Sequence, residues 1–464
     1  MESPANDQKT TKLLVFDKTT KLLVTGEAPN EIPDDVLTNI QENRRFIWWS
    51  LLFLNGSCLW AYYSCLSAQT YYNDRFKDTK YKFEYLTTLV TTWPMFVGHF
   101  TQVSLGLDKK LGFKNRIHIG YSILVLCALA IIFQDAFGAS PDTGAIIVLI
   151  AFAVVGFMNS LTESGFYALS ALFPDAIFTD AVQMGNGTSG IINVTLNTLI
   201  QLIVGGTNPA PEDKRDISKI SFYIFISVWI IVCFIAVYVF HKMMRIPAVH
   251  HLMERNDAET ARRAANKESY PEMWARLGRI TSAVAVPLLC IIIVFLCSLT
   301  VFPGIGISSG IQLAKGASWT TWYINGVLLS YNYGDFFGRL VAHKLYKFFT
   351  LQSCFLYSLV RWGFFILLLI GLPGLDAEGN PTKNPLFAMA SAHDFNIFWQ
   401  LFITLLVGVT NGILSTISLG LGSRLVPQDD RESAGAILCL GLFFGISSGA
   451  TVGWQFGVQH WLGA

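Results

Sequence analysis

Long apolar segments recur along almost the whole chain. Eight of them contain no Asp, Glu, Lys or Arg, and three more are interrupted by only one or two such residues. A helix needs about 20 mostly apolar residues to cross the hydrocarbon core of a membrane, whereas strands of a transmembrane barrel are shorter and alternate in polarity. The pattern predicts an all-α polytopic membrane protein with eleven transmembrane helices, at residues 46–73, 85–107, 117–134, 143–174, 181–211, 220–241, 280–314, 316–343, 348–375, 395–423 and 433–464.

The polar segments between these runs predict how the chain is organised. Residues 1–45 contain the near-duplicated sequence KTTKLLV, and we expect them to form a cytoplasmic, largely disordered tail. A charged segment, residues 244–280, separates six predicted helices (46–243) from five (281–464). This 6+5 arrangement favours two helical bundles that rock around a binding site at the membrane midplane. A plain connector between the two sets of helices is also compatible with the pattern.

The distribution of Lys and Arg predicts how the helices are oriented in the membrane. Lys and Arg near the ends of the predicted spans are about twice as frequent on the side of the N-terminus as on the other side. Cytoplasmic loops are enriched in these residues, so the N-terminus is predicted to be cytoplasmic and, with an odd number of spans, the C-terminus extracellular or lumenal. The net charge of +1 gives no indication of nucleic-acid binding.

Motifs for enzymatic chemistry are missing from the sequence. The eight histidines do not form a metal-ligand cluster, and no Walker-type nucleotide-binding loop is present. The eight cysteines lie in or beside apolar runs without a CxxC pattern, so we predict no disulfides. We therefore expect neither a cofactor nor a metal, and we do not expect an enzyme. A polytopic membrane enzyme or a receptor-like scaffold stays as a distant alternative, which would require a clustered catalytic set or large folded loops.

Two opposite charges lie within the predicted span at residues 316–343. Asp335 and Arg339 are four residues apart, so they share one face of a helix, and Asn332 lies on roughly the same face. Gly334 and Gly338 form a G-x-x-x-G pattern, which lets a neighbouring helix approach closely. Ionisable groups inside a membrane are costly and usually face a cavity. The pair is either an ion pair that locks helices together or part of a polar patch that binds a substrate with vicinal hydroxyls.

Three further polar side chains inside spans are candidate functional residues. Glu163 and Arg361 are each the single charged residue of an apolar run. Arg361 could pair with Glu163 or Asp335 across a cavity, or bind backbone carbonyls at the end of its span. His99 is a candidate proton site, although a histidine in this position is also compatible with a packing role. Glu163, His99 and Arg361 are therefore our candidates for proton or gating residues.

Four stretches of the chain combine glycines with polar or charged residues inside or beside apolar spans: FPDAIFTDAVQMGNGTSG (173–190), YNYGDFFGRL (331–340), GVTNGILSTISLGLGSRLVP (408–427) and ESAGAILCLGLFFGISSGATVG (432–453). Together they resemble the equilibrative nucleoside transporters. The resemblance in their order, their Asp/Arg motif and their glycine-rich spans runs from about residue 46 to the C-terminus, and LWAYY at residues 59–63 resembles the aromatic pattern of the family's first span.

The resemblance implies a major-facilitator-like fold of six plus five helices and alternating access without ATP. It also implies a set of substrate-binding residues. Asp335 and Arg339 would contact the ribose hydroxyls, and Trp60 would pack against the substrate. Glu163 occupies a position at which many members carry a glutamine that hydrogen-bonds the base, and Ile446 would line the apolar side of the pocket. Asn332, on the face of the Asp/Arg pair, completes our predicted set.

Two departures from the family pattern bear on the substrate. Ala61 follows the first-span tryptophan where the family has an asparagine, and Glu163 replaces the glutamine. An amide donates and accepts hydrogen bonds, whereas an ionised carboxylate only accepts. Glu163 could therefore favour exocyclic amines of a base, bind a cation or couple transport to protons. A protonated Glu163 that mimics glutamine is equally compatible with the sequence.

These observations lead to one functional hypothesis and one alternative. The hypothesis is facilitative transport of nucleosides, and of nucleobases as a further substrate class, by a monomer in a lipid bilayer, with the plasma membrane as the default location and an internal organelle membrane as the other. The alternative is a proton-coupled or organic-cation carrier of the same fold, with Glu163 as the coupling or cation site. The choice between purines and pyrimidines stays open.

Overall fold

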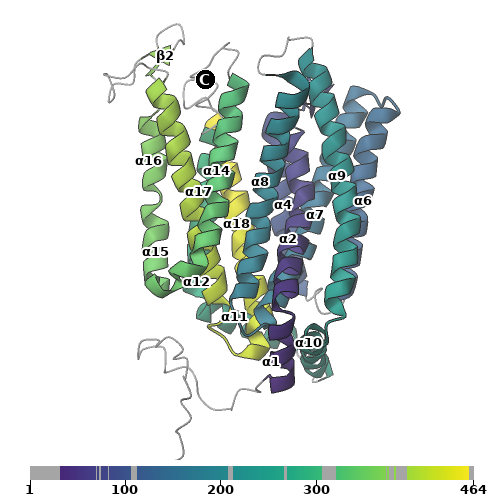
Figure 1. The fold of residues 1–464 in the computed structure, drawn as a ribbon, viewed down its shortest axis with the longest axis vertical. Coiled ribbons are helices and arrows are strands. Elements are labelled where there is room, and N and C mark those ends of the chain that lie inside the picture. Colours follow the sequence, from purple (N-terminus) through teal and green to yellow (C-terminus); the bar gives the residue numbers. More distant parts are fainter. Residues whose placement is uncertain are drawn as a thin grey trace, which may run out of the picture.

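The computed structural model describes most of the chain as a bundle of long, roughly parallel and antiparallel helices (Figure 1). The described residues are 32–68, 71–72, 75–81, 83–105, 112–206, 213–265, 269–305, 320–371, 374–375, 381–382 and 394–458. The KTTKLLV duplication lies outside them. Helices account for almost all of the described chain, as the apolar pattern predicted.

The described chain contains fifteen α-helices. In chain order they are α1 (Asp34–Glu42), α2 (Arg44–Ser67), α4 (Phe83–Leu105), α6 (Phe113–Ala136), α7 (Pro141–Leu172), α8 (Ile177–Gly205), α9 (Asp213–Met244), α10 (Pro247–Ala265), α11 (Tyr270–Ala283), α12 (Ala285–Leu299), α14 (Thr320–Leu345), α15 (Leu351–Val360), α16 (Gly363–Ile370), α17 (Asp394–Gly422) and α18 (Arg431–Val458). A π-helical turn η2 (Thr300–Ile305), two 3-10 turns, η3 (Tyr346–Phe348) and η4 (Gln428–Asp430), and one antiparallel pair of two-residue strands, β1 (Gly374–Leu375) and β2 (Pro381–Thr382), complete the described elements.

Eight segments of the described chain are helical, long and apolar enough to cross a membrane, so the protein is a multi-pass membrane protein. They are Phe113–Ala136, Pro141–Leu172, Ile177–Val204, Ile217–Met244, Ala285–Phe302, Leu351–Ile370, Ile397–Gly422 and Gln428–Gln455. Helices α2, α4 and α14 have 24, 23 and 26 residues but are less apolar. The reason is that their buried faces carry polar side chains, including Asn55, His99 and Asn332. The count of eleven spans stays a prediction.

Contacts between helices define two groups that we use below. The first helix group comprises α2, α4, α6, α7, α8 and α9, with close packing of α2 on α8, of α4 on α7 and of α6 on α7. The second helix group comprises α12, α14, α15, α16, α17 and α18, with close packing of α14 on α17 and of α12 on α18. The two groups meet where α8 packs on α14 and where α18 packs on α4 and α7.

Two polar segments outside the predicted spans contain helices. Residues 34–42, predicted to belong to a disordered tail, form helix α1, because Val36 and Ile40 are buried where α1 packs on α10. The charged linker, residues 244–280, contains helix α10 and most of helix α11. A capping box stabilises the start of α11: the Ser269 hydroxyl accepts from the Glu272 backbone N–H, and the Glu272 carboxylate accepts from the Ser269 backbone N–H.

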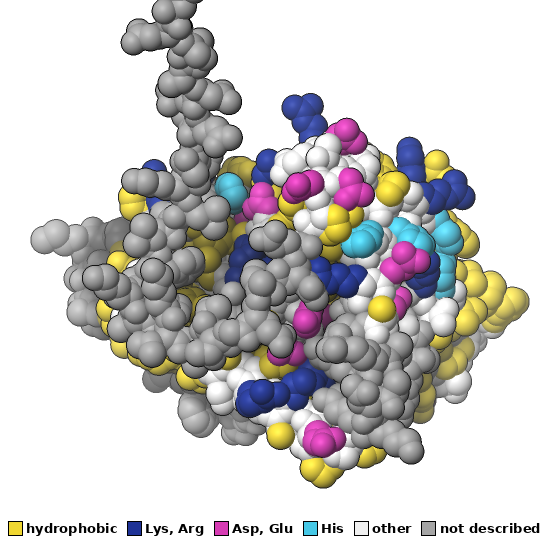
Figure 2. Space-filling view, turned by 90° about the horizontal axis from the view of Figure 1, so that it is seen from below, with side chains coloured by type: hydrophobic (Ala, Val, Ile, Leu, Met, Phe, Trp, Pro, Cys, Tyr) yellow, Lys and Arg dark blue, Asp and Glu magenta, His cyan; other side chains and the backbone are white. Residues whose placement is uncertain are grey.

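The two ends of the bundle differ in composition. Helices α1, α10 and α11 lie together at one end (Figure 1). Figure 2 looks onto that end and shows basic, acidic and histidine side chains gathered there, with hydrophobic side chains at its margin. Between the ends, the bundle interior is mainly apolar, and all eight cysteines are buried and free.

Candidate functional site

The site begins with the ion pair on α14. Arg339 Nε donates to Asp335 Oδ2 at 2.8 Å, and both side chains are buried, which fits the predicted i, i+4 spacing. Desolvation of two charges is costly unless each finds additional hydrogen-bond partners. The helices on either side of α14 supply these partners.

Helix α17 supplies the partner of Asp335. A Cβ atom on Gly334 would lie 2.4 Å from the Leu405 carbonyl oxygen, and one on Gly412 would lie 2.1 Å from the Asp335 carbonyl oxygen, so the two backbones touch at glycines. This approach places the Asn411 amide beside the carboxylate, and Asn411 Nδ2 donates to Asp335 Oδ1 at 2.7 Å. Both carboxylate oxygens of Asp335 therefore accept a hydrogen bond.

Helix α8, from the first helix group, supplies the partners of Arg339. Arg339 Nη1 donates to the side-chain oxygen Oε1 of Gln183 and also lies 3.2 Å from the backbone oxygen of Gln183. Gly187 makes room for this contact, since a Cβ atom there would lie 3.0 Å from Arg339 Cδ. The guanidinium is thus held between a carboxylate of the second helix group and an amide of the first.

Glu163 lies on α7 and is buried within the first helix group. Its Oε1 accepts from Asn186 Nδ2 at 3.0 Å, and no basic side chain pairs with it in the part of the chain that the structure describes. Asn186 also donates to the Tyr167 hydroxyl at 3.0 Å and accepts from Asn55 Nδ2. A carboxylate that accepts a single hydrogen bond keeps capacity for further donors.

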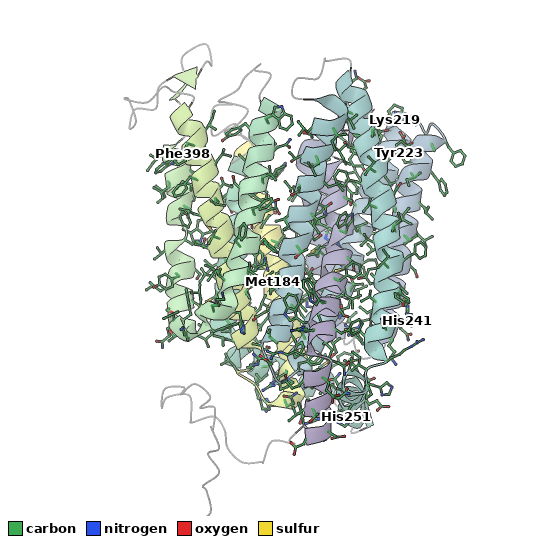
Figure 3. The ribbon with its side chains drawn as sticks, in the orientation of Figure 1. Met184, Lys219, Tyr223, His241, His251 and Phe398 are labelled. Atoms are coloured by element: carbon green, nitrogen blue, oxygen red, sulfur yellow. The ribbon has the colours of Figure 1, made fainter. Side chains whose placement is uncertain are left out.

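Hydrogen bonds connect these two parts of the site. Gln183 Nε2 donates to the Tyr167 hydroxyl, to which Asn186 also donates. A chain of side chains therefore runs from Glu163 to Asp335 across the boundary between the helix groups: Glu163, Asn186, Tyr167, Gln183, Arg339, Asp335. In Figure 3, Met184, the residue after Gln183, lies between the two ends of the bundle, which Lys219 and Tyr223 mark on one side and His241 and His251 on the other.

Arg361 does not pair with Glu163 or with Asp335, as one predicted alternative would require. It lies at the break between α15 and α16 and donates to the Val294 oxygen at 2.6 Å, the Val407 oxygen at 2.7 Å, the Thr410 hydroxyl at 2.8 Å and the Ser298 hydroxyl at 2.7 Å. The other predicted alternative was that Arg361 binds backbone carbonyls at the end of its own span. Arg361 does bind two backbone carbonyls, but they belong to α12 and α17.

The other predicted residues lie in different settings. Asn332 is buried and donates to the Leu328 oxygen of its own helix, while its Oδ1 faces Gly190 of α8. Trp60 is buried on α2, and its indole Nε1 has no hydrogen-bond partner in the described chain. Ile446 is partly buried on α18. The ring Nε2 of His99 lies 2.7 Å from the backbone oxygen of Ala436 on α18, which is a packing contact between the helix groups.

Sequence reasoning missed the neutral residues of the site. Gln183, Asn186, Tyr167 and Asn411 connect the charged groups, yet none was singled out. Gln183, Asn186 and Asn411 lie within stretches that carried the family resemblance, whereas Tyr167 lies outside them. Within the described residues, no group of three His, Cys, Asp or Glu side chains could hold a metal ion.

The arrangement offers a carboxylate, a guanidinium and several amides inside a membrane-embedded bundle. Such groups bind hydroxyls and the polar edges of a small solute. Residues 149–458 match the sequence model of a family described as "Nucleoside transporter". The chain belongs to the nucleoside transporter family. The matched range is more than half of the chain and includes Glu163, Gln183, Asp335, Arg339 and Asn411, so this member of the family is a transporter and not an enzyme.

Individual relatives are distant but match over most of their length. The transporter is 23% identical to equilibrative nucleotide transporter 1 of Arabidopsis thaliana over 73% of this chain and 70% of the relative. It is 21% identical to equilibrative nucleoside transporter 4 of Danio rerio (88% and 82%) and 20% identical to equilibrative nucleoside transporter 1 of Homo sapiens (81% and 82%). These matches confirm the predicted family.

Solved structures show the same fold at lower identity. The transporter resembles FucP, a Major Facilitator Superfamily transporter crystallised in the outward conformation, with a TM-score of 0.55, 14% identity and coverage of 88% of this chain and 96% of FucP. It also resembles the proton:xylose symporter XylE, with a TM-score of 0.55, 14% identity and coverage of 90% and 89%. The predicted major-facilitator-like fold is thereby confirmed.

Proposed function

We propose that this protein carries nucleosides across a membrane down their concentration gradient, by alternating access. The observation that supports this most strongly is the hydrogen-bonded chain from Glu163 to Asp335, which crosses the boundary between the helix groups inside the bundle. A site shared by two groups of helices can be opened to either side by their relative movement. No nucleotide-driven machinery is required for such a cycle.

In this proposal the substrate lies between α7, α8 and α14. Asp335 accepts from a ribose hydroxyl while Arg339 donates to one, since a carboxylate next to a guanidinium suits vicinal hydroxyls. Glu163 accepts from the base, and Trp60 packs against it. Asn332 adds a polar contact on the face of the Asp/Arg pair, and Ile446 covers the apolar side.

The proposed architecture has eleven spans in two bundles, residues 46–243 and 281–464, joined by the linker 244–280 that contains α10 and α11. The charged end of the molecule in Figure 2 then faces the cytoplasm, in line with the enrichment of Lys and Arg in cytoplasmic loops. The C-terminal end of α18 lies on the extracellular or lumenal side. We place the protein in the plasma membrane as a monomer.

Counterflow in proteoliposomes tests the function directly. Vesicles that contain the purified protein and are loaded with unlabelled adenosine are expected to accumulate labelled adenosine transiently, without ATP or an ion gradient. Competition by other nucleosides and by nucleobases then defines the substrate class. Absence of exchange for every nucleoside and nucleobase would contradict the proposal.

A second candidate is a proton-coupled or organic-cation carrier, and the environment of Glu163 supports it. Its carboxylate is buried with Asn186 as its one hydrogen-bond donor in the described chain and with no basic partner. Such a group can take up a proton or face a cationic substrate. Uptake measured against pH for the wild type and for Glu163→Gln decides between the candidates. Proton coupling predicts a steep profile that the variant flattens, and identical profiles would rule it out.

A further inference from the structure

Gln183 lies at the point where the two helix groups share a charged side chain. It is fully buried on α8, and both ends of its amide are engaged: Oε1 accepts from Arg339 Nη1, and Nε2 donates to the Tyr167 hydroxyl. Arg339 makes two further hydrogen bonds in the structure: Nη1 also donates to the Gln183 backbone oxygen at 3.2 Å, and Nε donates to Asp335 on its own helix. The Gln183 amide is thus a direct hydrogen-bonded link from the first helix group to the arginine of the proposed ribose site.

An amide oxygen and a hydroxyl oxygen are chemically similar acceptors for a guanidinium, because both are neutral and present lone pairs to N–H donors. A buried arginine also needs such an acceptor when no substrate is present, since an unmet donor is costly in a dry interior. Gln183 fulfils this need with its amide oxygen, and under the proposed function a substrate hydroxyl would take the same position. Gly187, one turn further along α8, allows the contact because it leaves space for Arg339 Cδ.

We propose that Gln183 is a positioning residue that occupies Arg339 in the empty carrier and gives way to a substrate hydroxyl. This inference rests on the proposed function. In the empty carrier, the bond from Arg339 to Gln183 must break before α8 and α14 can separate. In the loaded carrier, the substrate satisfies Arg339, so the helix groups move without losing this hydrogen bond. Gln183 therefore slows the return of the empty carrier relative to the movement of the loaded one.

This role predicts a specific kinetic signature. The maximal rate of equilibrium exchange depends on the loaded carrier alone, whereas net uptake into empty vesicles also requires the empty carrier to return. Gln183→Met keeps a side chain of similar length but removes the amide. The ratio of exchange to net uptake is expected to fall at least about threefold, since hydrogen bonds to charged groups are stronger than neutral ones. Gln183→Glu replaces the amide with a charged acceptor and is expected to raise the ratio and the KM for the nucleoside.

Thr198→Val is the matched control on the same helix, because the Thr198 hydroxyl donates to the Val194 oxygen within α8 and touches no part of the site. Its exchange ratio is expected to equal that of the wild type. A packing role for Gln183 would instead lower exchange and net uptake together in both Gln183 variants. Such a result, or an unchanged ratio in both variants, would overturn the inference.

A distance measurement keeps this test separate from the proposed function. Arg45 on α2 and Lys347 in η3 are exposed near one end of the bundle, where Asp180 of α8 meets His343 of α14. Spin labels attached at Arg45→Cys and Lys347→Cys report the distance between the two helix groups. Labelling is selective for these two positions because the eight native cysteines are buried. In the empty protein, Gln183→Met is expected to broaden the distance distribution, and Gln183→Glu to narrow it. Wild-type protein that exchanges no nucleoside would contradict the proposed function, whereas distributions that do not change in either variant would contradict the role of Gln183.

Discussion

Two buried arginines of the second helix group have opposite surroundings. Arg339 donates to a side-chain carboxylate on α14, and on α8 to the side-chain amide and the backbone oxygen of Gln183. Arg361 has no carboxylate partner in the described chain and instead donates to two backbone oxygens and two hydroxyls, all on α12 and α17. The hydrogen bonds of Arg339 cross the boundary between the two helix groups, whereas those of Arg361 stay within the second helix group.

This difference separates the binding role that we propose for Arg339 from a structural role of Arg361. Side-chain acceptors can turn away when a ligand arrives, so Arg339 can exchange its two side-chain partners, Asp335 and Gln183. Backbone oxygens are fixed by their helices, so Arg361 holds α12 and α17 at the break between α15 and α16. A charged residue inside a membrane is a functional hypothesis by default, and its partners decide which kind of function it has.

The largest expected effect comes from the double variant Asp335→Asn/Arg339→Met. Removing both charges avoids a single buried charge without a partner, so the protein is expected to fold. Nucleoside uptake should fall by about a hundredfold or more, because two charge-assisted contacts to the substrate are lost. Uptake and size-exclusion profiles are measured together. Arg44→Met/Asp175→Asn, which removes a half-exposed ion pair of 3.0 Å, is the control and should transport normally. Substantial uptake by the first variant would refute the binding role.

The second effect concerns folding. Arg361→Met removes four hydrogen bonds from a charged donor, each of which contributes about 1.5–3 kcal/mol. We expect a lower yield of monodisperse protein and a marked drop in Tm. Arg361→Lys should not restore stability, because an ammonium group cannot reach all four acceptors in the planar arrangement of a guanidinium. Normal stability combined with lost transport would instead place Arg361 in the substrate path.

A smaller effect is expected from the interface between α14 and α17. A Cβ atom on Gly408 would lie 2.3 Å from the Tyr331 oxygen, so Gly408→Ala must push the two helices apart. Transport should fall by about tenfold, because displacement by even 1 Å misplaces Asp335. Gly363→Ala is the matched control, since nothing lies within 4 Å of its Cβ position. Equal rates for the two variants would show that the close approach is not needed for transport.

The smallest effect tests whether the two arginines are connected. The Ser298 hydroxyl accepts from Arg361 and donates to Asn411 Oδ1 at 2.7 Å, and Asn411 in turn donates to Asp335. Ser298→Ala breaks this path while both arginines keep their other partners. Uptake is expected to change less than about threefold, with a modest rise in KM. A loss as large as that of the Asp335/Arg339 variant would mean that the two regions act as one unit.

The sequence allowed the charged half of the site to be predicted, because its pattern is local. Spacing of four residues within one helix is enough to place Asp335 beside Arg339. The glycine pattern likewise predicted a close helix neighbour for α14, although it did not identify α17. Long apolar runs predicted the helices themselves, since burial in lipid leaves few other backbone structures.

The other half depends on how separate helices are rotated against each other, which no local pattern encodes. Gln183 was within a stretch used for the family resemblance, yet its contact with Arg339 joins residues 156 positions apart. Helix α1 was missed for a related reason: it is short and polar, and contact with α10 stabilises it rather than intrinsic propensity. The partners of Arg361 belong to two other helices, α12 and α17, and for the same reason could not be predicted from the sequence.

The glycine contacts between α14 and α17 have a mechanical consequence. Backbones that touch at Gly334, Gly338, Gly408 and Gly412 fit in one register, because a shift along either helix would bring side chains into the space that the glycines leave. The two helices, α14 and α17, are therefore expected to move as one rigid body. Bending and sliding are left to the boundary with α8, where side-chain hydrogen bonds such as Thr195 with Tyr333 and His343 with Asp180 take part in the contacts. Asp335 and Arg339 both lie on α14, so the two charged side chains would move together and by the same amount.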